Sequence, residues 1–151
     1  MVGDFSVGKT SLTQKFVNNV FSEKYLSTIG VKIDTAFVND TKLIVWDVAG
    51  RDSLSPINAS YLVGANGIVL VCDGTRQSTV RDIKDIWQVV KERIGEVPAV
   101  VALNKADLED WHIDAQHTAY FEEQRWQTFE TSAKEGQNVK ALFEALITEI
   151  G

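Results

Sequence analysis

The sequence predicts an α/β protein with a doubly wound, mostly parallel sheet of six strands and helices on both faces. Short apolar runs alternate along the chain with segments in which apolar residues recur at helical spacing. Polar motifs directly follow several of these runs, and open α/β sheets bind their ligands beyond the carboxyl ends of the strands. A chain of 151 residues is long enough for a full core, so we expect one domain over residues 1–151.

The first predicted strand is short. Only Met1 and Val2 precede Gly3, whereas strands usually have about five to six residues, so we expect this strand to be truncated in the sequence. A two-residue turn at 39–40 joins the next two strands as a hairpin, and the last three are short buried runs. These five strands are predicted at residues 31–38, 42–46, 67–72, 98–104 and 128–132.

Helices are predicted between the strands. The first begins near Lys9. A second begins with Ser55 as its N-cap and Pro56 at its first position, and Gly64 can end it. Two longer helices have apolar stripes that we assign to the core, and Gly95 caps the first of them. The stripes consist of Ile83, Ile86, Trp87, Val90 and Ile94, and of Leu142, Phe143, Leu146, Ile147 and Ile150.

Residues 3–10, GDFSVGKT, match the phosphate-binding pattern G-x-x-x-x-G-K-[ST] at every fixed position. Glycines let the backbone wrap closely around phosphate oxygens, so that successive N–H groups point inward. Lys9 can reach the β- and γ-phosphates, the Thr10 hydroxyl can ligate Mg²⁺, and the helix that follows adds its positive end. We therefore expect nucleotide contacts from Gly3, Asp4, Phe5, Ser6, Val7, Gly8, Lys9, Thr10 and Ser11.

Two further motifs follow apolar strands. Asp47 ends one such strand, which suits a second Mg²⁺ anchor, and Gly50 leaves its N–H free to meet a γ-phosphate. Residues 104–107, NKAD, follow another. The Asp107 carboxylate can accept from both the ring N–H and the amine of guanine, whereas adenine would leave it unpaired. Alone, this motif also fits a polar turn between a strand and a helix; after a phosphate loop, it favours guanine.

Taken together, these motifs resemble those of the Ras superfamily of small GTPases, whose fold is that of the P-loop NTPases. Residues 104–107 are similar to the family's guanine-specificity motif, and residues 131–134, TSAK, to its S-A-K loop. Residues 21–30, FSEKYLSTIG, resemble its first switch in the form of the Rab-like branch, and residues 57–67 also look Rab-like. The resemblance covers essentially the whole chain, with the motifs in the family's order.

The resemblance implies GTP or GDP and Mg²⁺ as cofactors. It assigns the metal to Thr10, Thr28 and Asp47. It places Phe21 against the base and directs the N–H of Ala133 to the guanine O6. The remaining residues that it assigns to the nucleotide are Asn104, Lys105, Asp107, Ser132 and Lys134. It further implies a protein effector and an exchange factor that bind the two switch segments, and a monomer.

Several features depart from the family pattern. Arg51 stands where the family has the glutamine that orients the attacking water, and a guanidinium has donors only. Arg51, Gly50 and Lys9 are thus the expected catalytic residues, with the role of Arg51 open. Phe5 occupies a loop position that is often small, where its ring could block a catalytic arginine from a partner. The hairpin between the switches is a few residues shorter than usual.

Two functions therefore remain. The first is a GTP-binding molecular switch with slow intrinsic hydrolysis. The alternative is a GTP-binding interaction module with negligible hydrolysis, which Arg51 and Phe5 favour more than the family resemblance alone does. An adenine-nucleotide kinase or ATPase is disfavoured by residues 104–107.

Composition excludes other classes. A net charge of −6 and a pI near 4.9 argue against a nucleic-acid partner. The sequence has no membrane-spanning stretch or signal peptide, and its one cysteine, Cys72, fits a buried strand in a reducing compartment. We expect a cytoplasmic protein without a visible lipid anchor, peripheral to membranes only if a lipidated tail is missing. His112 and His117 are five residues apart, which favours surface histidines over a helical metal pair.

Overall fold

The computed structural model describes residues 1–24, 28–50 and 59–151. The predicted helix start at Ser55 and Pro56 lies outside these residues, as does Arg51.

The centre of the molecule is a parallel sheet of four strands in the order β1 (Val2–Gly3), β4 (Ile68–Asp73), β5 (Ala99–Asn104) and β6 (Gln127–Glu130). Every residue of β4 and β5 is buried, which explains why these strands appear in the sequence as continuous apolar runs rather than alternating ones. Their carboxyl ends lie at one edge, where the polar motifs begin.

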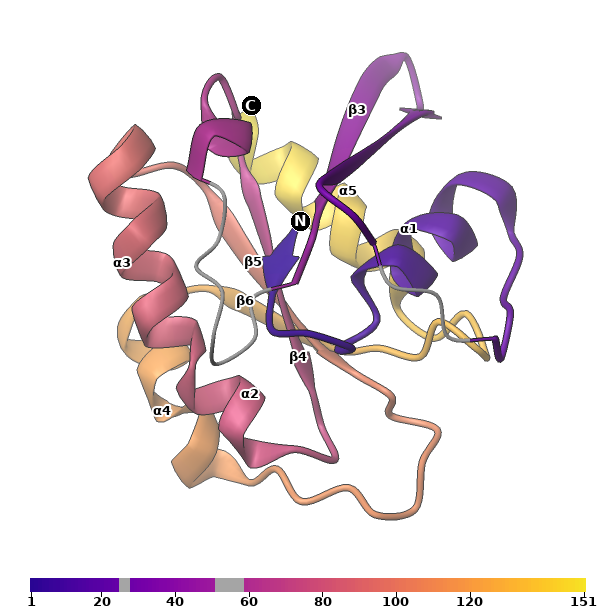
Figure 1. Ribbon diagram of the computed structural model, residues 1–151, viewed down its shortest axis with the longest axis vertical. Helices are drawn as coiled ribbons and strands as arrows, with labels where there is room; N and C mark the ends of the chain where they lie inside the picture. Colours follow the sequence, from indigo (N-terminus) through magenta and orange to yellow (C-terminus); the bar gives the residue numbers. More distant parts are fainter. Residues whose placement is uncertain (25–27, 51–58) are drawn as a thin grey trace.

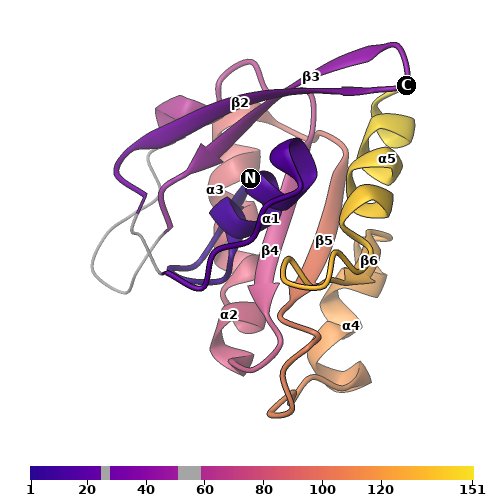
Figure 2. The ribbon, with the colours of Figure 1, turned by 90° about the vertical axis from the view of Figure 1, so that its right-hand side faces the viewer.

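The other two strands, β2 (Val31–Val38) and β3 (Thr41–Val48), form an antiparallel hairpin. It lies beside helix α1 (Figure 2). Met1 joins it to the sheet: the Met1 nitrogen donates to the Trp46 carbonyl (2.7 Å), and the Val48 N–H donates to the Met1 carbonyl (3.3 Å). The six predicted strands are therefore present, but they are arranged as a four-stranded parallel sheet with an adjoining hairpin. A first strand of two residues offers too little backbone for a longer ladder.

Helices cover both faces of the sheet, as predicted (Figure 1). One face carries α1 (Lys9–Asn18) and α5 (Val139–Ile150), and the other carries α3 (Ile83–Ile94) and α4 (Ala115–Glu123). Two short elements, η1 (Ala59–Leu62) and α2 (Gln77–Arg81), complete the described helical elements. Successive residues of β4 point to opposite faces, so its apolar side chains contribute alternately to two separate hydrophobic clusters.

All of the predicted α3 stripe, together with Leu142, Phe143 and Leu146 of the predicted α5 stripe, lies in or against these clusters. The prediction was wrong for the rest of the α5 stripe: Ile147 is only partly buried and belongs to neither cluster, and Ile150, in the last turn, is exposed. The α3 stripe packs with Leu70 and Cys72 on one face, and the buried part of the α5 stripe packs with Leu12 and Val71 on the other. Cys72 is fully buried, and burial raises the pKa of its thiol. Among the helices that the structure describes, none combines the length and apolar character needed to cross a bilayer.

Candidate nucleotide-binding site

A pocket of about 960 Å³ opens at the carboxyl edge of the sheet. Most of the predicted site residues that the structure describes line it: Phe5, Ser6, Gly8, Lys9, Thr10, Ser11, Phe21, Thr28, Gly50, Asn104, Lys105, Asp107, Ala133 and Lys134. Five others are not among the lining residues, namely Gly3, Asp4, Val7, Asp47 and Ser132. Arg51 lies outside the described residues.

The loop between β1 and α1 has its carbonyl groups turned toward side chains. Five consecutive carbonyls, those of residues 3–7, each accept a side-chain hydrogen bond. The donors, in order, are Lys9 Nζ to Gly3 (3.3 Å) and Asp4 (2.8 Å), Arg76 Nη2 to Phe5 (2.7 Å), Lys105 Nζ to Ser6 (2.9 Å) and Asn104 Nδ2 to Val7 (3.0 Å). In a trans peptide the N–H points away from the carbonyl, so the N–H group of each following residue points away from these donors; among them, the Phe5 N–H donates to Asp4 Oδ1 at 2.7 Å. Inward N–H groups are what an anion requires.

Lys9 supplies the cation of this loop. Only 6% of the residue is exposed, and burial lowers the pKa of its ammonium to about 8, against the opposing charges of Asp47 and Asp4. Gly50 packs directly on it: a Cβ on Gly50 would lie 2.8 Å from Lys9 Nζ and 2.8 Å from the Phe5 Cα. The start of the second switch and the phosphate loop thus meet at the lysine.

Three oxygens come together beside Lys9. Thr10 Oγ1 lies 2.7 Å from Thr28 Oγ1 and donates to Asp47 Oδ2 at 2.5 Å. Asp47 is fully buried, its Oδ1 has no hydrogen-bond partner among the described residues, and burial raises the pKa of its carboxyl. Mg²⁺ prefers such oxygen ligands and would neutralise this charge. The three predicted metal residues therefore fit Mg²⁺, held by Thr10 and Thr28 with Asp47 behind them.

The opposite end of the pocket is formed by the loops after β5 and β6. Thr131 links them, because its hydroxyl donates to Asn104 Oδ1 (3.1 Å) and its carbonyl accepts from the Ala106 N–H (2.9 Å). Ser132 Oγ donates to Asp107 Oδ1 at 2.8 Å, which fixes the carboxylate at the pocket wall. Ser132 thus has a supporting place rather than a lining one.

Across this end of the pocket, Lys134 Nζ pairs with Glu23 Oε1 at 3.5 Å. Lys134 comes from the loop after β6 and Glu23 from the first switch, and both line the pocket together with Phe21. The pair connects the two walls between which the predicted base would lie.

Two charged residues of this region, Asp73 and Arg76, are not among the residues predicted from the sequence. Asp73 is the last residue of β4, just as Asn104 is the last residue of β5. The feature that identified Asn104 and Asp47, a polar residue at the end of an apolar run, is therefore present for Asp73 as well. Arg76 has no such signal, because its partner carbonyl is 71 residues away in the chain.

The two histidines lie away from the pocket. His117 closes the N-terminus of α4: its Nδ1 accepts from the Asp114 N–H, and the Asp114 carboxylate accepts from the N–H groups of Gln116 and His117. This capping box gives His117 a role in the helix. Within the described residues, no group of three or more His, Cys, Asp or Glu side chains forms a metal cluster.

Known proteins resemble this chain in sequence. A model of the Ras family matches residues 1–151. The chain is 35% identical to Ras-related protein Rab-1 of Theileria annulata, over 97% of this chain and 70% of that protein. It is 33% identical to Ras-related protein Rab-3C of Bos taurus (97% and 68% covered) and 35% identical to Ras-related protein Rab-1A of Dictyostelium discoideum (99% and 78% covered).

Proposed function

The chain belongs to the Ras family of small GTPases, in its Rab-like branch, and we propose that it is a molecular switch that binds GTP and GDP with Mg²⁺ and hydrolyses GTP slowly. One observation carries this proposal. The phosphate loop, the hydroxyl groups of Thr10 and Thr28 with Asp47 bonded to Thr10, and the carboxylate of Asp107 meet at one pocket, with the oxygen group beside Lys9 and Asp107 at the other end.

Each part of the pocket has its own task in this proposal. The loop N–H groups and Lys9 bind the phosphates, and a Mg²⁺ held by Thr10 and Thr28 would neutralise part of the phosphate charge. Asp107 reads the two donors of guanine, with Ser132 holding its carboxylate in place. Thr28 and Gly50, at the edges of the two switches, would contact the metal and the γ-phosphate, so these segments change when the γ-phosphate leaves.

Slow hydrolysis follows from Arg51, which cannot accept a hydrogen bond from the attacking water. A second candidate function is a GTP-binding interaction module with negligible hydrolysis. Phe5 favours it, because this residue lines the pocket on the phosphate loop with 42% of its surface exposed. A ring there could block a catalytic arginine supplied by a partner.

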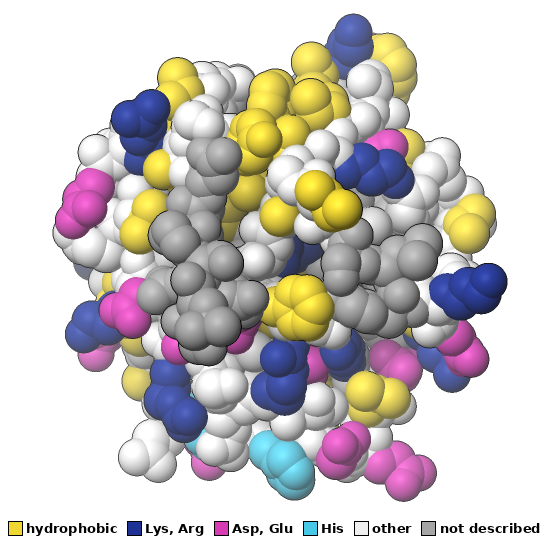
Figure 3. Space-filling view, in the orientation of Figure 1, with side chains coloured by type: hydrophobic (Ala, Val, Ile, Leu, Met, Phe, Trp, Pro, Cys, Tyr) yellow, Lys and Arg dark blue, Asp and Glu magenta, His cyan; other side chains and the backbone are white. Residues whose placement is uncertain are grey.

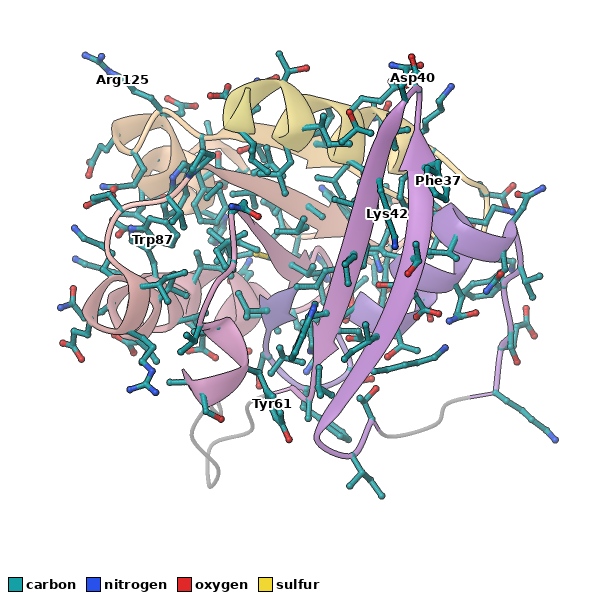
Figure 4. All side chains as sticks on the ribbon, turned by 90° about the horizontal axis from the view of Figure 1, so that it is seen from above. Phe37, Asp40, Lys42, Tyr61, Trp87 and Arg125 are labelled. Carbon is teal, nitrogen blue, oxygen red and sulfur yellow. The ribbon has the colours of Figure 1, made fainter. Side chains whose placement is uncertain are left out.

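A surface for partners adjoins the switches. The outer face of the β2–β3 hairpin exposes Ile33, Phe37, Ile44 and Trp46, and the Trp46 ring lies 6.5 Å from that of Tyr61. Hydrophobic side chains gather on this side of the molecule between η1 and the hairpin (Figure 3). Figure 4 shows Phe37 beside Lys42 on the hairpin and Tyr61 toward its other end. These side chains support effector or exchange-factor binding through the switch region.

The test is to denature the purified protein and identify the released nucleotide by chromatography. We expect GDP or GTP at close to one equivalent, with Mg²⁺. Recovery of ADP or ATP, or thermal melts unaffected by added guanine nucleotide, would contradict the proposal. Asp107→Asn supplies the matched variant, because it should lose guanine and favour xanthine, whose carbonyl matches the new amide donor.

A further inference from the structure

Arg76 connects the end of β4 to the phosphate loop. It precedes α2, and its Nε donates to Asp73 Oδ2 at 3.0 Å while its Nη2 donates to the Phe5 carbonyl at 2.7 Å. One guanidinium therefore spans a buried carboxylate and a loop carbonyl. The Ras family pattern of the sequence gave no reason to expect this contact.

Asp73 is a rigid anchor for this bridge. Its side chain is 1% exposed, and its Oδ1 accepts from both the N–H (2.9 Å) and the hydroxyl (2.7 Å) of Thr75. Its Oδ2 pairs with Lys105 Nζ (2.8 Å) as well as with Arg76. Although burial acts to raise the pKa of Asp73, these hydrogen bonds hold it below its usual value, so the carboxylate stays charged.

Both cations on Asp73 continue to the phosphate loop, to adjacent carbonyls. Arg76 reaches Phe5 and Lys105 reaches Ser6. Each cation holds the carbonyl that it bonds to on its own side of the loop. The peptide whose carbonyl belongs to Phe5 carries the N–H of Ser6, and in a trans peptide that N–H points the other way. Ser6 lines the pocket.

We propose that Arg76 is a positioning residue for the phosphate loop, which holds the Phe5 carbonyl so that the Ser6 N–H faces the bound phosphates. This inference rests on the proposed function, because it presupposes a phosphate in the pocket. It assigns Arg76 no contact with the nucleotide. Its action passes through the backbone of the loop.

The fork of the guanidinium is essential to this role. Arginine presents several donors in a fixed plane and can meet a carboxylate and a carbonyl together, whereas lysine is a point charge on a flexible stem. Arg76→Lys therefore keeps the charge and loses the bridge. Arg81, at the end of the same short helix, is exposed and has no hydrogen bond or ion pair with the phosphate loop among the described residues, so Arg81→Ala removes an equal charge as a matched control.

The experiment measures equilibrium binding of GDP, GTP and GMP to the parent protein, R76A, R76K and R81A, with thermal melts of each. We expect R76A and R76K to lose about tenfold in affinity for GDP and GTP alike, the scale of one hydrogen bond to a charged group. The preference for GDP over GMP should fall by a similar factor, because GMP lacks the phosphates that the loop encloses. R81A should match the parent.

Several outcomes would overturn the proposal. Parent-like binding by R76K would mean that Arg76 acts only through its charge. A loss confined to GTP would make it a ligand of the γ-phosphate, and equal losses for GDP and GMP would reduce it to a role in general stability. Absence of GDP binding by the parent and R81A as well would instead remove the proposed function and this inference with it. R76K keeps the test valid if R76A does not fold.

Discussion

The side-chain amide of Asn104 occupies the space where a side chain on Gly8 would have to lie. A Cβ built on Gly8 overlaps Asn104 Nδ2, and that same nitrogen donates to the Val7 carbonyl at 3.0 Å. Gly8 also has φ +102°, in the left-handed region that disfavours L side chains. The end of β5 is thereby pinned against the start of α1, and the base side of the pocket is tied to the phosphate side.

Gly8→Ala tests this relationship. We expect it to abolish nucleotide retention and to lower the midpoint of thermal unfolding, because it combines overlap with backbone strain of roughly 1–2 kcal/mol. Gly64→Ala is the control: Gly64 also has positive φ (+86°), but nothing lies within 4 Å of a Cβ there. Equal losses in the two variants would show that the contact with Asn104 is unimportant.

The metal site gives a second prediction. Thr10→Ala should release GDP in Mg²⁺ buffer nearly as fast as the parent does after chelation, because it removes the hydroxyl that lies between Thr28 and Asp47. Release of a fluorescent GDP analogue, followed with and without chelator, measures this. Thr118→Ala, on the surface of α4, is the control. If chelation accelerates release equally in Thr10→Ala and in the parent, Thr10 does not hold the ion.

Lys9 makes nucleotide binding depend on pH. Burial lowers its pKa from 10.5 to about 8 in the protein without ligand, whereas a bound phosphate favours the ammonium and raises the pKa again. The complex therefore holds a proton that the free protein loses, and affinity falls as pH rises above about 8. Calorimetry at pH 8.5 in two buffers of different ionisation enthalpy should show proton uptake on binding. Proton release, or affinity that increases with pH, would contradict this assignment.

The stability of the nucleotide-free protein should change with pH in the opposite direction to nucleotide affinity. As pH rises, Lys9 loses its proton at a lower pH in the folded protein than in the unfolded chain. The contribution of Lys9 to the free energy of unfolding should therefore rise between about pH 8 and 10.5. Both states are protonated below that window, and the contribution there is constant. Chemical denaturation of nucleotide-free protein across the window measures it.

The pair of Glu23 and Lys134 gives a fourth prediction. Because it joins the two walls of the base end, Glu23→Gln should speed GDP release by about twofold at low salt, the scale of an exposed ion pair, and less at high salt. The pair of Lys140 and Glu144 has the same 3.5 Å separation on α5, away from the pocket. Glu144→Gln should therefore leave release unchanged. Acceleration by both variants would indicate a general charge effect.

Part of the site was predictable because its residues come at the ends of apolar runs. The run before Asn104 is the buried strand β5, which placed Asn104 at the carboxyl edge of the sheet. The run before Asp47 is apolar as well, although it belongs to the largely exposed hairpin strand β3. Asp73 also follows an apolar run, but the sequence does not indicate that its carboxylate pairs with two cations, Arg76 and Lys105, from different parts of the chain. Arg76 was not predictable, because only the folded chain brings it to a carbonyl 71 residues away.

The fold shows the same division. Helices α3 and α5 have apolar stripes and were predicted, whereas α4 buries only Phe121 and has no such stripe. The helix was missed because the signal that specifies it, the Asp114 cap, involves few residues. The hairpin is separate from the parallel sheet because β1 is short, and two hydrogen bonds of Met1 join the two; no periodicity in the sequence reveals either feature.

The last prediction concerns catalysis. We expect intrinsic GTP hydrolysis at or below roughly 10⁻⁴ s⁻¹, the scale of unassisted Ras-type GTPases. Positioning of the attacking water supplies much of the rate acceleration in phosphoryl transfer, and Arg51 has hydrogen-bond donors only, so it cannot accept from that water. The opposite role is that Arg51, as part of a switch, reaches the γ-phosphate and stabilises the charge of the transition state as a built-in arginine finger.

Single-turnover hydrolysis by the parent, Arg51→Gln and Arg51→Ala separates these two roles of Arg51. Slow hydrolysis through lost water positioning requires the Gln variant to be faster than the parent and the Ala variant to be no slower. A tenfold or greater loss in Ala, about 1.4 kcal/mol of barrier, would instead make Arg51 a catalytic residue.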